Sequence, residues 1–275
     1  MEVIESSDGG GRHAGAPVGA SESSTGTYWR CGSVDGVTAG PTSRLVDVEH
    51  GAELRIWHGR LLRGPGYAAA PRLARQVLAR LGAVINLRSH ARYHVHAAGV
   101  AAPDGRAWLL TGETGSGKST LTYALARQGW PVLGDDGVVL ERVAQGIIAH
   151  SWREPLQVSI ELEAFFPELR EHDALVNWRD PRHRVAVSAK FIKRARVAGV
   201  IVLERGTNDE LSALAPTSAL ATLVRQSTFV LVTDGHAPSN LATLRDLVES
   251  VPCFLLRHTP AQLTSIDATI LSAAG

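Results

Sequence analysis

Residues 112–119 read Gly-Glu-Thr-Gly-Ser-Gly-Lys-Ser and match the phosphate-binding loop pattern G-x-x-x-x-G-K-[ST]. Glycines let the backbone turn its N–H groups inward around a polyphosphate, and Lys118 adds a full positive charge. The hydroxyl of Ser119 is an oxygen ligand of the kind that Mg²⁺ accepts. An apolar run precedes the loop and a helical pattern follows it, which is the strand–loop–helix context that this chemistry needs. The pattern therefore predicts binding of ATP or GTP.

The residues predicted to contact the nucleotide are Gly112, Glu113, Thr114, Gly115, Ser116, Gly117, Lys118, Ser119 and Thr120. No Asn-Lys-x-Asp motif is present to read guanine, which favours ATP, and no Leu-Ser-Gly-Gly-Gln motif indicates an ABC-type ATPase.

A pair of carboxylates, Asp135 and Asp136, follows Lys118 by 17 and 18 residues, directly after a short apolar run. Carboxylates at the end of a strand beside a triphosphate can hold Mg²⁺, and one can accept the proton of an attacking hydroxyl. The alternative is a plain turn, because Asp-Asp-Gly often joins two β segments. The presence of the phosphate loop favours the functional interpretation.

Residues 93–101 read as one strand that pairs, through a turn at 103–105, with the strand entering the loop. His94 and His96 would share one face of that strand. Taken alone, each is an ordinary strand histidine. Because its strand lies beside the loop strand, His96 is expected near the phosphates, whereas His94 keeps the ordinary interpretation.

The 275 residues are 44% hydrophobic and carry a net charge of +1, which is ordinary for a globular protein and indicates neither nucleic acid nor a membrane surface as a partner. No run of about 18 apolar residues is present to span a bilayer. Cys31 and Cys253 match no metal-binding spacing, which is typical of free thiols in a reducing compartment. We therefore expect a cytoplasmic protein.

The organisation expected from turns and periodicity has three parts. Residues 1–26, rich in Gly and Ser and without signal-peptide features, form a disordered tail. Residues 27–92 form a small β-rich region with a hairpin turning at 49–51 and one helix, 71–81, that ends at Gly82. Residues 93–275 form an α/β domain. Its expected elements are strands 131–134, 138–141, 147–149, 196–204 and 254–256 and helices 161–169, 217–225, 240–249 and 260–271.

Three segments together resemble the HPr kinase/phosphorylase family: His96-Ala97-Ala98, the loop 112–119 and Gly134-Asp135-Asp136. The chain is most similar to the shorter relatives, which include kinases of lasso-peptide biosynthesis. The resemblance runs from about residue 94 to 141 and more weakly to the C-terminus. It implies a P-loop kinase core of the HPr kinase/phosphoenolpyruvate carboxykinase-like type with a mixed sheet, using ATP and Mg²⁺ to phosphorylate a serine hydroxyl.

Carried over by position, the resemblance implies that Lys118 neutralises the β- and γ-phosphates. It also implies that Ser119 and Asp135 hold the metal. Asp136 would be the general base and His96 would lie beside it, although which aspartate is the base stays open. The full-length enzymes of that family form hexamers, which leaves a homo-oligomer open for this chain.

The chain departs from the family in two places. The segment 150–156 keeps Arg153 of the Ile-Arg-Gly-Leu-Gly-Ile signature but places Ser151 where its glutamate would fall, and Ser239 replaces an arginine of a later motif. These departures indicate a kinase without phosphorylase activity whose substrate is not HPr. We expect the acceptor to be a serine of a peptide or small protein, with the C-terminal serine of a lasso-peptide precursor as the specific hypothesis.

Arg153, Lys190 and Lys193 are candidate substrate contacts, and the alternative for these basic residues is a solvated face. A small-molecule hydroxyl kinase and a non-catalytic nucleotide-binding regulator remain the alternatives for the whole chain.

Overall fold

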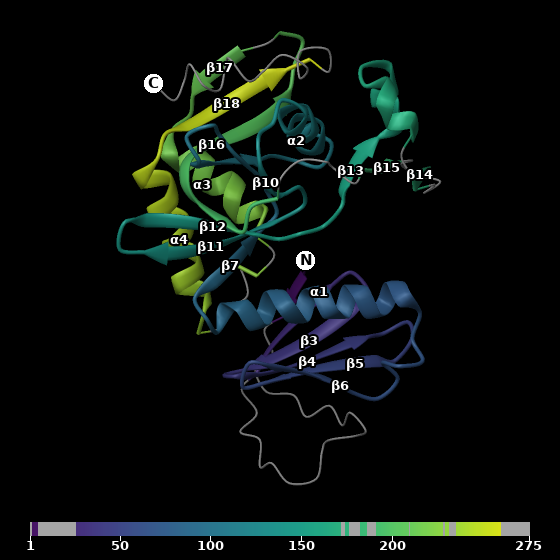
Figure 1. Ribbon diagram of the computed structural model, residues 1–275. Helices are drawn as coiled ribbons and strands as arrows, with labels where there is room; N and C mark the ends of the chain where they lie inside the picture. The colour runs from purple at the N-terminus through teal and green to yellow at the C-terminus, as the bar shows by residue number, and fades with distance from the viewer. Residues whose placement is uncertain are drawn as a thin grey trace. The chain divides into compact units, whose positions relative to one another are not determined.

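The computed structural model describes residues 2–4, 26–171, 174–175, 182–185, 191–208, 210–227, 229–230 and 235–259 (Figure 1). The chain divides into two compact units, residues 1–91 with 229–239, and residues 92–228 with 240–275. The second stretch of the first unit includes Phe229, whose ring packs edge-on against Trp29 at 5.1 Å between centroids.

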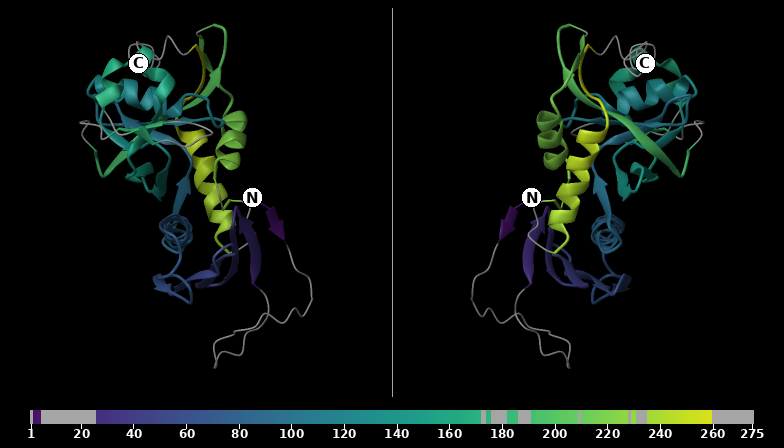
Figure 2. Two further views of the ribbon diagram at one scale, coloured as in Figure 1. Left: turned by 90° about the vertical axis from the view of Figure 1, so that its right-hand side faces the viewer. Right: turned by 90° about the vertical axis from the view of Figure 1, so that its left-hand side faces the viewer.

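The first unit is a six-stranded antiparallel meander in which each strand pairs with the next along the chain. Its strands are β1 (Glu2–Ile4), β2 (Thr27–Cys31), β3 (Val34–Ala39), β4 (Thr42–Asp47), β5 (Ala52–Trp57) and β6 (Arg60–Arg63). Alternate residues of β3 and β4 are buried, as a sheet with one covered face requires. The helix α1 (Arg72–Arg88) packs against β4, β5 and β6 (Figures 1 and 2). The β-rich N-terminal region expected from the sequence is confirmed.

Two expectations for this unit were wrong. The helix does not end at Gly82 but continues to Arg88. A Cβ at Gly82 would lie 2.5 Å from Leu54 Cδ2, so the glycine allows close packing of the helix on the sheet and does not terminate the helix. Residues 2–4 pair with β2 instead of belonging to a disordered tail, and the backbone bonds extend the sheet by one strand. Residues 1 and 5–25 of that expected tail lie outside the described residues.

The second unit is built on a nine-stranded mixed sheet with strand order β10-β8-β9-β16-β12-β11-β7, to which β18 adds on β16 and β17 on β18. The strands are β7 (Arg92–Val95), β8 (Ala98–Ala101), β9 (Ala107–Thr111), β10 (Val132–Gly134), β11 (Val138–Val143), β12 (Gly146–Ser151), β16 (Arg194–Arg205), β17 (Glu210–Ala213) and β18 (Cys253–His258). The long strand β16 pairs with β12 near its start and runs parallel to β9 and β18 over its second half. The mixed sheet expected from the sequence is therefore confirmed.

The helices of this unit are α2 (Lys118–Arg127), α3 (Pro216–Arg225) and, from Asn240 on, α4 (Ala237–Ser250). Figure 2 shows α2 on one face of the sheet and α3 and α4 on the other. Leu121 and Leu125 of α2 are fully buried against Trp108 and Leu110 of β9 and Ile201 of β16. This packing fixes the start of α2 relative to the end of β9, which is where the phosphate loop lies.

A small three-stranded sheet consists of β13 (Leu156–Ser159), β14 (Ala174–Leu175) and β15 (Arg182–Val185). The helix expected over 161–169 is instead two short 3₁₀ segments, Ile160–Ala164 and Pro167–Glu171, because Pro167 lacks an N–H and disfavours helical geometry in the residue before it. The helix expected over 260–271 lies outside the described residues. Within the described part of the chain, no helix has the length and apolar character needed to cross a membrane.

Candidate active site

The phosphate-loop sequence forms a tight connection between β9 and α2. Gly112, Gly115 and Gly117 all have positive φ, at 145°, 80° and 99°, which side-chain-bearing residues rarely adopt. Gly117 caps the helix in the left-handed conformation, and Leu121 N makes the bond back to Gly117 O. The amides of the first turn of α2 have no intrahelical partner, so they form a positive helix terminus suited to an anion.

Gly112 is required by its neighbours as well as by its backbone angle. A Cβ at this position would lie 2.5 Å from Leu203 O on β16 and 2.8 Å from Ser116 Oγ. The backbone of the adjacent parallel strand β16 therefore lies too close to Gly112 to leave room for a side chain.

Lys118 folds back over the loop that precedes it. Its Nζ donates to Gly112 O at 2.8 Å and to Glu113 O at 3.1 Å, and the residue is only 8% exposed. These carbonyls hold the ammonium against the glycine turn. Phosphate oxygens are stronger acceptors for such a group than carbonyls, so the lysine is placed to bind them.

The antiparallel pairs β8–β10 and β7–β11 are separated by a common interruption of the strands. Register partners are Gly134 with Gly99 on one side of the break and Val138 with Val95 on the other. Between them, residues 96–98 face residues 135–137. The continuous strand expected over 93–101 is therefore wrong, and His94 and His96 do not share a strand face, because β7 ends before His96.

His96 and Asp136 meet across this break. The imidazole Nδ1 lies 3.1 Å from Asp136 Oδ1 and 3.2 Å from Asp136 O, and both side chains are partly open to solvent, at 33% and 45%. With the carboxylate ionised, both partners are acceptors, so Nδ1 carries the proton. The backbone N–H of His96 donates to Gln226 O at 2.8 Å, which ties the histidine to the end of α3.

Asp135 lies in a different environment from its neighbour. It is 3% exposed, and its Oδ2 accepts a hydrogen bond from the backbone N–H of Gln157, in β13, at 3.3 Å. The turn that carries both aspartates is tight, since a Cβ at Gly137 would lie 2.2 Å from His94 Nε2. His94 is itself packed edge-on against Trp152, at 4.9 Å between ring centroids. The imidazole therefore holds a fixed position against the backbone of the turn at Gly137.

The aspartate turn and the phosphate loop open on the same edge of the sheet. Strands β9 and β10 are both antiparallel to β8, which lies between them, so they run in the same direction. Leu110 pairs with Ala98 and Gly134 with Gly99, so the ends of the two strands are at the same level. Two strand spacings separate them, on the order of 10 Å between backbones.

Ser119 is half-buried at the second position of α2, and no cluster of three or more His, Cys, Asp or Glu side chains that could hold a metal occurs within the described residues. The predicted donor set is thus one hydroxyl and the Asp135 carboxylate. Two oxygen donors fit Mg²⁺, which keeps several waters and is completed by substrate phosphates.

Two contacts to the loop were not anticipated from the sequence. His258, at the end of β18 and 1% exposed, lies with Nε2 2.6 Å from Ser116 O. Arg225 Nε lies 3.6 Å from Glu113 Oε1 in an exposed pair. No local motif marks either residue, because the strand and helix that bring them to the loop are distant in the sequence.

The predicted substrate residues that the structure describes lie on two neighbouring segments, 151–153 and 191–193. The Arg153 guanidinium lies over the Phe191 ring at 5.9 Å, and Lys193 is exposed with its carbonyl accepting from Ser151 N at 2.9 Å. Lys190 lies outside the described residues. A role for these side chains in substrate binding stays a prediction.

Comparison with protein-family models gave no match. Comparison with curated protein sequences gave none either. Among solved structures, the chain is similar to the Hpr(Ser) kinase/phosphatase from Coxiella burnetii, with 15% identity over 66% of this chain and 89% of that one and a TM-score of 0.36.

Proposed function

We propose that this chain is an ATP-dependent, Mg²⁺-requiring kinase that phosphorylates a serine hydroxyl of a peptide or small protein. The observation that carries the proposal is the contact between His96 and Asp136, at a strand break on the same sheet edge as the phosphate loop. A protein that only captured nucleotide would need the loop but not a carboxylate oriented by an imidazole beside it. The resemblance of the three motifs adds an HPr kinase-like P-loop core to the proposal.

The loop residues 112–120 would bind the triphosphate through backbone N–H groups and the start of α2. Lys118 offsets negative charge at the terminal phosphates, and bound Mg²⁺, held by Ser119 and Asp135, would neutralise more of it. Phosphoryl transfer depends mainly on such positioning and charge, so a buried lysine and a preformed loop are what the reaction requires.

Asp136 is the proposed general base. Its exposed carboxylate accepts the proton of the acceptor serine as the serine oxygen bonds to the γ-phosphorus and the bond to the ADP oxygen breaks. The proton on His96 Nδ1 holds the carboxylate in one orientation. Asp135, buried and bonded to the Gln157 amide, is less accessible to a substrate hydroxyl, which supports a metal-binding rather than a base role for it.

The specific substrate that we propose is a peptide ending in serine, of the kind found in lasso-peptide precursors. The segment around Arg153, with Ser151 in place of a glutamate, supports transfer without the reverse phosphorolysis. Substrate identity and direction of reaction are separate claims and need separate tests.

The test is transfer of label from γ-labelled ATP, with Mg²⁺, to a peptide ending in serine, and to the same peptide ending in alanine as the matched acceptor control. We expect label in the first peptide only, and none with the Lys118→Ala variant. Label in glycerol or free serine but not in peptide would indicate a small-molecule kinase. Tight ATP binding without transfer to any acceptor would leave only nucleotide capture. Pyrophosphate released from phosphopeptide and inorganic phosphate would contradict the absence of phosphorylase activity.

A further inference from the structure

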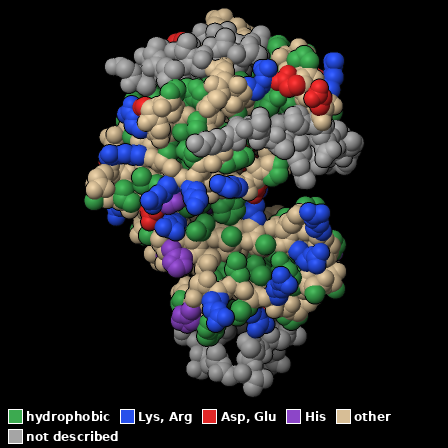
Figure 3. Space-filling model, in the orientation of Figure 1, with side chains coloured by type: hydrophobic (Ala, Val, Ile, Leu, Met, Phe, Trp, Pro, Cys, Tyr) green, Lys and Arg blue, Asp and Glu red, His purple; other side chains and the backbone are tan. Residues whose placement is uncertain are grey.

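Positive charge is concentrated in one segment of the N-terminal unit. The chain carries a net charge of only +1, yet residues 54–91 contain seven arginines and no aspartate or glutamate. On the face of this unit seen in Figure 3, basic side chains are spread over the surface and no acidic side chain is visible. An excess of one sign that is confined to one segment indicates a surface that attracts ligands of the opposite sign.

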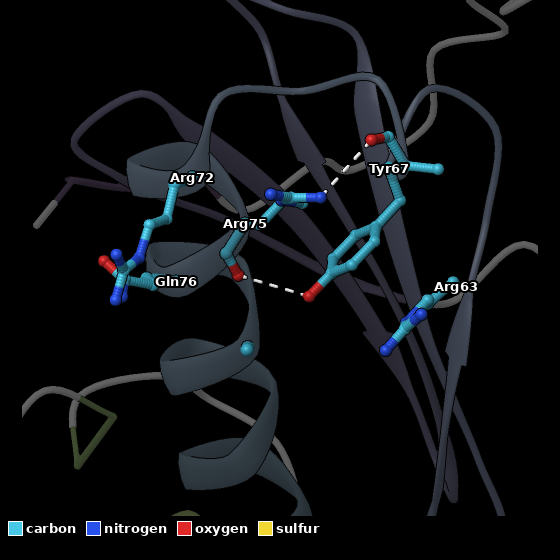
Figure 4. A pocket seen from close by; sticks show the side chains of 7 residues that line it. Arg63, Tyr67, Arg72, Arg75 and Gln76 are labelled. Atoms are coloured by element: carbon cyan, nitrogen blue, oxygen red, sulfur yellow. Dashed lines mark hydrogen bonds between the residues drawn. The ribbon is translucent and has the colours of Figure 1, made fainter.

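Three of these arginines line a depression of about 310 Å³ between the end of β6 and the first turns of α1 (Figure 4). Its principal lining side chains are Arg63, Tyr67, Arg72, Arg75, Gln76 and Ala79. Four of them stand on α1 at positions 72, 75, 76 and 79, a spacing that places them on one side of a helix. The depression therefore has one wall of arginines from the helix and one arginine from the sheet.

The walls of the depression are held in place by contacts of their own. Tyr67 donates from its hydroxyl to Arg75 O at 3.3 Å, and Arg75 Nη1 donates to Ala68 O at 3.3 Å. The Arg63 guanidinium lies 5.6 Å from the centre of the Tyr67 ring. The tyrosine is thus fixed between helix and sheet, and it spaces the arginines apart (Figure 4).

Among the residues that the structure describes, no carboxylate pairs with the charges of the depression. Within the described residues, Arg63, Arg72 and Arg75 form no ion pair, whereas Arg44 and Arg55 of the same unit both pair with Glu53. The first turn of α1 contains no acidic residue, so Arg72 stands at the positive end of the helix dipole, where a cation is destabilising and a bound anion is favoured. Repulsion among these positive charges lowers the stability of the free protein, and a bound anionic ligand would reduce that repulsion.

The adjoining strand indicates that this ligand is a peptide. In the described part of the chain, β6 is the edge strand of its sheet and pairs with β5, and all four of its residues are exposed. An extended chain can add to such an edge through backbone hydrogen bonds. Leu61 and Leu62 of this strand are 43% and 44% exposed, which offers apolar contact along the same edge.

We propose that the depression binds the carboxylates of an acidic, extended peptide segment that lies along β6. If the chain is the peptide kinase proposed above, on which this assignment of the ligand as substrate rests, the segment is a part of the substrate distinct from the phosphorylated serine. Arginine forms paired hydrogen bonds with carboxylates, so three arginines select for two or more acidic side chains.

The experiment measures fluorescence anisotropy of a fluorescein-labelled octapeptide that alternates Glu and Val, without nucleotide, against the same peptide with Gln for Glu. The variant Arg63→Gln/Arg72→Gln/Arg75→Gln is compared with Arg30→Gln/Arg106→Gln/Arg245→Gln, which removes equal charge from exposed arginines that pair with Asp35, Asp104 and Asp246. We expect the first variant to bind the Glu peptide at least about tenfold more weakly and the control to bind it as the parent does. The double variant Arg63→Gln/Arg72→Gln keeps the Arg75 bond to Ala68 and should show most of the loss.

Equal affinity of the two triple variants, or of the Glu and Gln peptides, would overturn the proposal. Binding of tripolyphosphate alone, without the peptide, would identify a small-oxyanion site and also overturn it. The Lys118→Ala variant should keep peptide binding. If the parent binds the peptide through these arginines but transfers no phosphate to any acceptor, the proposed kinase function is wrong while this site stands.

Discussion

Replacing Asp136 by Asn tests the proposed base directly. The substitution keeps the size of the side chain and removes its capacity to accept a proton at neutral pH. A positioned general base contributes about 10² to 10⁴ in rate, so kcat should fall by that factor, or about 2.7 to 5.5 kcal/mol. The structure predicts little effect on folding, because His96 and Asp136 are 33% and 45% exposed and an exposed pair contributes about 0–1 kcal/mol.

The assay combines three measurements on one preparation: label transfer at saturating ATP, ATP affinity by calorimetry, and the thermal midpoint. The control is Asp104→Asn, which removes a carboxylate that is also 45% exposed and paired, with Arg106, in the turn between β8 and β9. We expect ATP affinity to be unchanged or slightly tighter in the Asp136 variant, because a negative charge beside the phosphates is lost. A kcat within about threefold of the parent, well short of the loss of a general base, would refute the base assignment.

Gly112→Ala should abolish ATP binding while the chain stays folded, since its Cβ would lie 2.5 Å from Leu203 O; calorimetry that still detects ATP would contradict this account of the loop. His258→Ala should weaken ATP binding about tenfold with kcat retained, because the buried Ser116 carbonyl loses its donor, and His258→Gln should restore affinity. Equal affinity in all three proteins would mean that this contact does not position the loop. Burial raises the pKa of the Cys253 thiol to about 11, so roughly one thiol in a thousand is ionised at pH 8 and disulfide-reagent labelling of Cys253 should be slow until the protein unfolds. Rapid labelling of native Cys253 would contradict its burial.

The local features of the site could be read from the sequence because they depend on neighbouring residues. The phosphate loop is encoded by glycines at positions that need positive φ, and all three adopt it. The turn of Asp135 and Asp136 follows from their place after a short strand. The sequence also indicated that the aspartates end a strand near the loop, and β9 and β10 do end on one edge of the sheet.

What only the tertiary structure decided are the contacts between distant segments. The same Asp-Asp dipeptide yields one carboxylate that is 3% exposed and bonded to Gln157 and one that is solvent-accessible and bonded to His96, and no local pattern distinguishes them. The strand break at His96 depends on register with a segment some forty residues away.

His258 and Gly82 are two further residues whose roles depend on contacts with distant segments. The histidine reaches Ser116 only because β18 lies parallel to β16, and the glycine stays inside α1 because Leu54 packs on it. The sequence by itself determined the backbone conformations that a few adjacent side chains impose, above all the phosphate loop and its helix. The tertiary structure decided which side chains are buried, paired or exposed, because packing and register join residues that no local rule relates.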